Sequence, residues 1–418
     1  MKIRVAHPNV PPHVRQSVLA YHEAGVLDLY YTSFMDHPDY WLSNLIRRVA
    51  PPLRSELRRR HAGELPFESI RNFPWREIMR TAASRYASPT MTDRVWEWAE
   101  LGFDRWVARH LDRSAQVLHL HEHCALFTMQ RAAELGLFTV YEQPSQHHAF
   151  FTRIANEQID RYPELAGEGT QLLIDEKAAR RNQRRDQELA LTNRIVCNSS
   201  FTRRTLTANH IPESKIDVIP LGFPEPVAAL PDRNWDRLVF LNAGTQNLRK
   251  ALHLLYRAWR LAQIPEKDAE LWLIGKMNLP ESTREGLPGK VTIRESIPQP
   301  DLMDLYLKAN VFILPTLADG FGMVITEAMS RGLIVITTEN SGGPDLITHG
   351  VDGLIIPAGS EEAIRQALSW CLENRDKLPD MSRRAWLRAA GWQWSDYRRG
   401  IVKLMTNRFE EFQGTHQS

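Results

Sequence analysis

The stretch that decides the fold is ILPTLADGFGMVITEAMSRGLIVITT, residues 313–338. An apolar strand is predicted to end before Pro315. Residues 319–322 (Asp-Gly-Phe-Gly) then form a loop, and a helix over 323–331 is stopped by Gly332 before a second buried strand. Glycines let a backbone approach a ligand closely, and a helix start presents unpaired N–H groups. This unit predicts a parallel α/β sheet with an anion site suited to a diphosphate.

The rest of the chain repeats this alternation of short apolar runs and helical patterns. Strands separated by helices predict a parallel sheet wrapped on both faces, formed here twice. The expected strands are residues 2–7, 27–32, 116–121, 138–141 and 194–197 in the first half, and 238–243, 271–274, 291–293, 311–314, 334–337 and 354–356 in the second. The predicted fold class is therefore α/β, with two doubly wound parallel-sheet domains facing a cleft.

Residues 219–236 separate the two halves and contain four prolines, a composition typical of a loop or linker. We place the boundary there, with a first domain of residues 1–224 and a second of residues 225–391. Residues 38–113 interrupt the alternation. They are rich in Trp, Arg and Pro and indicate two or three helices inserted into the first domain.

Charge, apolar runs and cysteine spacing argue against several classes of protein. The 52 basic and 50 acidic side chains give a net charge of +2, which argues against a nucleic-acid partner. No apolar run approaches the ~18 residues of a membrane helix, and the N-terminal residues lack the apolar core of a secretory signal. The three cysteines, Cys124, Cys197 and Cys371, are too far apart for a metal knuckle and fit a reducing compartment. We expect a cytoplasmic protein.

The second half offers two sets of candidate side chains. Asp319 and Glu327 can both face the cleft, one near a transferred group and one near a ribose; alternatively, they flank an ordinary glycine-rich turn. Arg249 and Lys250 stand at the predicted start of a helix, where cations oppose the dipole unless an anion is bound. They indicate phosphate binding, or a solvated basic helix start.

In the first half, polar residues follow the predicted strands. Residues 119–123 read His-Leu-His-Glu-His, so strand alternation would put three imidazoles on one side, a set that can bind zinc. They can equally be plain polar residues at a strand end. Glu142 and His147 follow the next strand, and His13 lies in the loop after the first.

DGFGMVITEAMSRGLIVITT resembles the signature of the family 4 nucleotide-sugar glycosyltransferases, which have the GT-B fold. Asp319 stands where the family usually has its first Glu, and Glu327 matches the second. Four further segments resemble the family in the same order: NRIVCNSSFTRRTL (193–206), VIPLGF (218–223), AGTQNLRKALHLL (243–255) and SGGPDLITHGVDGLIIPAG (341–359). Thr245 stands where the family has an Arg, and Ala251 where it has a Gly.

The resemblance implies catalytic roles for Asp319, His121 and Lys250. The residues placed against the donor are Glu327, Arg249, Gly244, Gly320, Phe321, Gly322, Met323 and Val324. On the acceptor side we place His123, Glu142, His147 and His13, and we expect no metal or other cofactor. The C-terminal helix, about 392–418, is expected to cross back to the first domain.

The implied reaction moves a hexose from a nucleoside diphosphate sugar to a hydroxyl acceptor with retention of configuration, in cell-surface polysaccharide or glycolipid synthesis. A lipid-linked acceptor would suit contact with an anionic membrane at the inner face of the plasma membrane. The arginine-rich stretches 46–60 and 176–187 are either solvated faces or that contact. The alternatives are a nucleotide-sugar epimerase and a non-catalytic nucleotide-sugar-binding protein.

Overall fold

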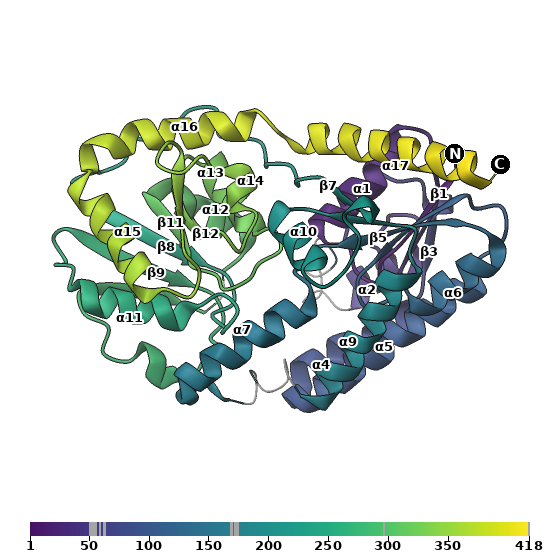
Figure 1. The fold of residues 1–418 in the computed structure, drawn as a ribbon, viewed down its shortest axis with the longest axis horizontal. Coiled ribbons are helices and arrows are strands. Elements are labelled where there is room, and N and C mark those ends of the chain that lie inside the picture. Colours follow the sequence, from purple (N-terminus) through teal and green to yellow (C-terminus); the bar gives the residue numbers. More distant parts are fainter. Residues whose placement is uncertain are drawn as a thin grey trace.

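The computed structural model describes residues 1–49, 57, 60–61, 64–167, 170, 175–295 and 297–416. Figure 1 shows two lobes, each built around one sheet, with the helices α16 and α17 running along one side from one lobe to the other. Every strand pairing between the named strands is parallel. The α/β fold class predicted from the alternation of strands and helices is confirmed.

The sheet of the first lobe has the order β3-β2-β1-β4-β5-β6-β7. Its strands are β1 Ile3–Ala6, β2 Leu27–Thr32, β3 Ile70–Asn72, β4 Val117–His121, β5 Phe138–Gln143, β6 Arg194–Cys197 and β7 Ile216–Val218. Its helices are α1 Pro12–Glu23, α2 Trp41–Val49, α4 Pro74–Tyr86, α5 Pro89–Arg109, α6 Leu126–Leu135, α7 His148–Arg161, α9 Glu176–Leu191 and α10 Ser200–Thr207.

The sheet of the second lobe has the order β10-β9-β8-β11-β12-β13. Its strands are β8 Leu238–Ala243, β9 Ala269–Ile274, β10 Lys290–Arg294, β11 Val311–Leu314, β12 Ile334–Thr338 and β13 Gly353–Ile356. Its helices are α11 Leu252–Ala262, α12 Gln299–Lys308, α13 Met323–Ser330, α14 Gly343–Leu346, α15 Glu361–Glu373 and α16 Leu378–Ala390, and α17 Trp394–His416 follows them.

Both sheets reverse their winding direction once. The reversal falls between β1 and β4 in the first lobe and between β8 and β11 in the second. Ligands of doubly wound sheets bind beyond the carboxyl ends of the strands at such a switch point. The loops that follow these four strands are therefore where functional side chains are expected, and they contain most of the candidates named above.

The C-terminal helix α17 lies against α1 of the first lobe, as the resemblance implies. The hydroxyl of Tyr397 lies 2.9 Å from Ser17 Oγ, and Arg398 pairs with Glu23 at 2.9 Å. Tyr397 is fully buried there. The second lobe is thus followed by a helix that belongs to the core of the first.

The insertion differs from the predicted set of helices in one respect. It contains α2, α4 and α5, but residues 70–72 also form β3, which adds to the edge of the sheet beside β2. Three residues are too few for a visible periodicity, and the same holds for β7. Within the described residues, no helix is long and apolar enough to cross a bilayer.

The glycine after β9 predicts a measurable stability effect. Gly275 has φ +140°, and a Cβ there would lie 1.9 Å from the Gly244 carbonyl oxygen. We expect Gly275→Ala to lower the free energy of unfolding by more than ~2 kcal/mol, since strain and a backbone clash add. Gly286→Ala is the control, because its φ of +64° brings strain alone among the described residues, roughly 1 kcal/mol. Equal losses in urea denaturation would contradict this account.

Candidate functional site

Two loops of the second lobe meet at its switch point. The loop after β8 carries Arg249 and Lys250, and the loop after β11 carries Asp319. The Arg249 carbonyl accepts hydrogen bonds from the Leu317 N–H and the Thr316 hydroxyl, both at 2.9 Å. The two loops are therefore fixed to each other through the backbone.

Asp319 forms ion pairs with both cations of the neighbouring loop. One carboxylate oxygen contacts the Lys250 ammonium, and the other lies 3.2 Å from Arg249 Nη1. Burial would raise the pKa of Asp319, but the charges of Lys250 and Arg249 lower it to about 2. Burial lowers the pKa of Lys250, and Asp319 opposes that effect. Three residues predicted separately thus form one cluster, with one carboxylate balancing two cations.

The predicted glycines have two different surroundings. A Cβ on Gly244 would meet no heavy atom of the described residues within 4 Å, so a ligand can approach this backbone. A Cβ on Gly320 would lie 1.9 Å from the Pro144 carbonyl oxygen of the first lobe. The Gly320 carbonyl also accepts a hydrogen bond from the Ser199 hydroxyl. Gly320 therefore allows the two lobes to pack closely at the loop after β11.

The loop enters α13 through Gly322, whose φ of +79° is left-handed. Phe321 is 2% exposed, and its side chain packs in the hydrophobic core and anchors the loop there. Met323 and Val324 are half-buried at the start of the helix. These residues place the N-terminus of α13 next to the charged cluster in sequence, and their contact with a donor stays a prediction.

Glu327 lies on α13 and is held by two neighbours. Its carboxylate oxygens accept hydrogen bonds from Gln299 Nε2 at 3.1 Å and from the Tyr306 hydroxyl at 3.3 Å. Burial raises the pKa of Glu327, and these two hydrogen bonds oppose the rise. Among the described residues no cation forms an ion pair with Glu327, although the charge of Arg331 also opposes the rise of its pKa. The carboxylate is thus held in place and able to accept hydrogen bonds from hydroxyl groups.

In the first lobe, buried imidazoles and one carboxylate gather at the ends of β4 and β5. Nε2 of His119 lies 3.1 Å, and Nε2 of His121 3.2 Å, from Oε2 of Glu142. The ring of His7, which follows β1, stacks edge-on against that of His121 with centroids 4.9 Å apart. His13, on α1, has its Nε2 3.9 Å from Oε1 of Glu142. Glu142 is therefore a partner of His121 rather than a separate surface group.

A cavity of about 420 Å³ lies beside this cluster, and Arg249 of the second lobe forms part of its lining. It contains three of the predicted residues, His13, His121 and His123. The other residues lining it are His7, Glu122, Pro144, Ser145, Gln146, His148, Phe151, Thr152, Ala178, Arg181, Asn182 and Arg185. The donor-side cation Arg249 and the predicted acceptor-side histidines thus share one space.

The electrostatics of this cavity are dominated by arginine. Arg185 Nε lies 3.3 Å from Glu122 Oε1 and hydrogen-bonds the His123 ring. Burial, reinforced by Arg185, lowers the pKa of His123 to about 3, and burial lowers that of His13 to about 4. His123 has a left-handed φ of +82°, a conformation that costs a non-glycine residue ~1–3 kcal/mol. His13 and His123 are therefore neutral near pH 7, and the guanidinium groups bring positive charge to the cavity.

His147 does not line the cavity among the described residues. It caps α7, with Nδ1 accepting a hydrogen bond from Ala149 N–H, and its Nε2 lies 3.5 Å from Asp186. Its role toward an acceptor stays a prediction.

The basic stretch 176–187 has a location that neither sequence interpretation gave. Arg184 is 9% exposed and faces Glu97 and Glu100 of α5, while Arg181 pairs with Asp93 at 2.6 Å. These arginines link α9 to α5, and Arg181 also lines the cavity. The i, i+4 spacing of the arginines predicted that they share one face of a helix. It did not reveal their acidic partners, which lie on α5, about 90 residues earlier in the sequence.

The comparisons with known proteins agree with this architecture. Residues 237–374 match the family model described as "Glycosyl transferases group 1". This confirms the predicted resemblance over most of the second lobe. HepE from Anabaena, solved in complex with UDP-glucose, superposes with a TM-score of 0.60 at 15% identity over 97% of this chain and 100% of that one. The chain has the GT-B fold.

Two curated relatives match over part of their length. A D-inositol 3-phosphate glycosyltransferase of Thermobispora bispora is 24% identical over 255 residues, which is 55% of this chain and 59% of the relative. The capsular polysaccharide biosynthesis glycosyltransferase CapM of Staphylococcus aureus is 26% identical over 197 residues, 42% of this chain and 51% of the relative. The matches thus span little more than half of these relatives.

The charged cluster predicts a change in anion affinity. Asp319→Asn removes the carboxylate that balances Arg249 and Lys250, so we expect pyrophosphate to bind roughly tenfold more tightly, about 1.4 kcal/mol. Isothermal titration calorimetry measures this directly. Asp376→Asn, at an exposed position outside the site, is the matched control and should bind as the unaltered chain does. Unchanged or weaker binding by Asp319→Asn would show that the carboxylate does not compete with the anion.

Proposed function

We propose that the protein transfers a hexose from a nucleoside diphosphate sugar to a hydroxyl acceptor with retention of configuration. The observation that carries the proposal is the cluster of Arg249, Lys250 and Asp319 at the switch point of the second lobe, with Arg249 reaching the cavity of the first. The similarity to group 1 glycosyl transferases and the UDP-glucose complex of HepE support it.

In the proposed reaction the bond between the anomeric carbon and the β-phosphate oxygen breaks, and a bond to the acceptor oxygen forms on the same face. The acceptor proton passes to the departing phosphate oxygen. Negative charge develops on the diphosphate, where Lys250, Arg249 and the N-terminus of α13 stabilise it. No metal is assigned to this step, because these groups supply the positive charge.

The remaining residues position the two substrates. We assign Glu327 to the ribose hydroxyls, because its carboxylate is fixed by hydrogen bonds from Gln299 and Tyr306 and forms no ion pair among the described residues. Asp319 is assigned to sugar hydroxyls once the diphosphate has taken over its cations. His121 forms the wall of the cavity on the sugar side, and the cavity holds the acceptor. Packing of Gly320 against Pro144 brings the two lobes together at the edge of the site.

The site assignment predicts the effect of two truncations. Glu327→Ala and Lys250→Ala should each reduce the transfer rate at least ~100-fold, as loss of a positioned electrostatic group does. Glu266→Ala and Lys267→Ala, both exposed and in a loop away from the site, are the matched controls. The measurement is acceptor-dependent release of nucleoside diphosphate. Sugar interconversion without release would favour an epimerase, and nucleotide binding without turnover would favour a binding protein.

We also propose that the acceptor is lipid-linked and that the protein works at the inner face of the plasma membrane, in cell-surface polysaccharide or glycolipid synthesis. Between residues 41 and 86 the sequence has ten arginines and four glutamates, a net charge of +6. Large aromatic side chains are exposed on α2 and α4, which lie in this range: Trp41 is 63%, Trp75 66% and Tyr86 87% exposed. Apolar side chains with arginines around them suit an anionic bilayer surface.

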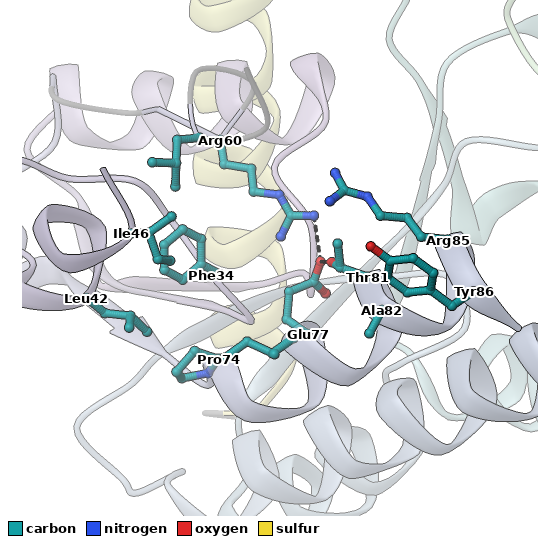
Figure 2. A pocket seen from close by; sticks show the side chains of 12 residues that line it. Phe34, Leu42, Ile46, Arg60, Pro74, Glu77, Thr81, Ala82, Arg85 and Tyr86 are labelled. Carbon is teal, nitrogen blue, oxygen red and sulfur yellow. Dashed lines mark hydrogen bonds and ion pairs between the residues drawn. The ribbon is translucent and has the colours of Figure 1, made fainter. Parts of the chain in front are cut away.

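Figure 2 shows the apolar cavity between α2 and α4, about 250 Å³ in volume. Phe34, Leu42 and Ile46 line one side, and Pro74 and Ala82 the other. Glu77 on its floor is neutralised by Arg60 at 2.5 Å and by Arg80 at 2.6 Å. A cavity with apolar walls and a neutralised floor suits an acyl or isoprenoid chain of a lipid-linked acceptor.

This surface predicts lipid-dependent membrane binding. The chain should float with vesicles of phosphatidylglycerol and phosphatidylcholine but not with phosphatidylcholine alone, because each arginine near an anionic surface contributes about 1 kcal/mol. Trp41→Ser with Trp75→Ser should reduce the bound fraction several-fold. Leu261→Ser, an exposed apolar position on α11 of the other lobe, is the control. Equal flotation of the double variant and the control would contradict the proposed surface.

A further inference from the structure

The buried cluster at the ends of β4 and β5 has three polar atoms that lie close together but form no directed hydrogen bond. Nε2 of His119, Nε2 of His121 and Oε2 of Glu142 have no hydrogen-bond partner among the described residues. Both nitrogens are within ion-pair distance of Oε2, at 3.1 and 3.2 Å, but neither contact has the direction of a hydrogen bond. All three side chains are at most 2% exposed.

The outer nitrogens of the two rings are fixed by the fold. His121 Nδ1 lies 3.1 Å from the Ala6 carbonyl, which can only accept, so Nδ1 carries the hydrogen and the neutral ring has its lone pair on Nε2. His119 Nδ1 lies 2.9 Å from the Tyr21 hydroxyl. Metal-binding histidines are held in this way, with the far nitrogen on a carbonyl or another polar partner and the near nitrogen free.

The distances match those between two ligands of one ion. With Zn–N and Zn–O bonds near 2.0–2.1 Å and tetrahedral angles, neighbouring ligand atoms are roughly 3.3 Å apart. Ligand atoms of one ion point their lone pairs at the ion and not at each other. The two histidine nitrogens and Oε2 are likewise close together without pointing at each other in hydrogen-bond geometry. The donor atoms of His119, His121 and Glu142 all lie within 4.8 Å of one another.

We propose that His119, His121 and Glu142 bind a divalent transition-metal ion, with Zn²⁺ as the best match to two imidazoles and one carboxylate. The ion would tie β4 to β5. Its fourth position would face the cavity, because His121 and His13 line that cavity and His13 Nε2 lies 3.9 Å from the other oxygen of Glu142. A water molecule or a substrate oxygen is the class of ligand that fits there.

The proposed metal ligands differ from the three histidines, His119, His121 and His123, that strand alternation in the sequence predicts. His123 does not join His119 and His121, because β4 ends at His121 and His123 turns away with φ +82° to contact Arg185. Glu142 of the neighbouring strand takes its place. The inference departs from the expectation that the chain binds no metal, and it does not depend on the proposed transfer reaction.

The test measures metal binding without any sugar donor. The purified chain is stripped with a chelator, loaded with Zn²⁺ and dialysed, and its zinc is counted by mass spectrometry. A parallel sample is loaded with Co²⁺ and examined for the visible absorption of tetrahedral cobalt. We expect about one ion per chain and a Tm several degrees higher with Zn²⁺ than with Mg²⁺, by binding linkage.

Variants assign the ion to this cluster. His119→Gln and Glu142→Gln should lose the retained ion and the cobalt spectrum, while His22→Gln, at an exposed position of α1, should keep both. Asp186→Asn removes the half-exposed set of His147, His148 and Asp186, and it too should keep both. Circular dichroism and pyrophosphate binding show that each variant is folded. Wild-type protein that retains no ion, or an ion lost only in Asp186→Asn, would overturn the proposal.

Discussion

The structure of the second lobe depends on one charge balance. Lys250 and Arg249 are drawn into the switch point between β8 and β11, and the carboxylate of Asp319 is what compensates them. Removing Asp319 would leave two partly buried cations uncompensated, which destabilises the loops, although by less than the ~3–5 kcal/mol of a fully buried pair. In the proposed function an incoming diphosphate replaces that carboxylate as the counter-ion, so the charge balance that holds the two loops together would also provide an anion site.

The first lobe contributes neutral imidazoles and guanidinium groups to the same cleft. Burial keeps the imidazoles of His13 and His123 neutral, and the guanidinium groups of Arg181 and Arg185 line the cavity. The backbone approach of Gly320 to Pro144 and the bond from Ser199 hold the lobes together at this point. Cationic groups from both lobes thus line one cavity, an arrangement that favours a ligand with negative charge.

The sequence predicted the periodic parts of the molecule well and the tertiary pairings less well. Strand and helix patterns predicted both sheets, and glycine with charge placement singled out Asp319, Arg249 and Lys250. β3 and β7, of three residues each, were missed because so short a segment has no readable period. His7 was not assigned a role, although its position directly after a strand is a signal that could have found it. That Glu142 lies against His119 and His121 depends on register between β4 and β5, which one sequence alone does not reveal.

The central claim is that a nucleoside diphosphate binds at the charged cluster of the second lobe, and a crystal structure of the chain with UDP tests it most directly. The account predicts the β-phosphate within about 3 Å of the Lys250 ammonium, at the start of α13, with the Asp319 contact to Lys250 broken or shared. A nucleotide bound elsewhere, with the pair between Asp319 and Lys250 intact and no phosphate beside it, would contradict the account.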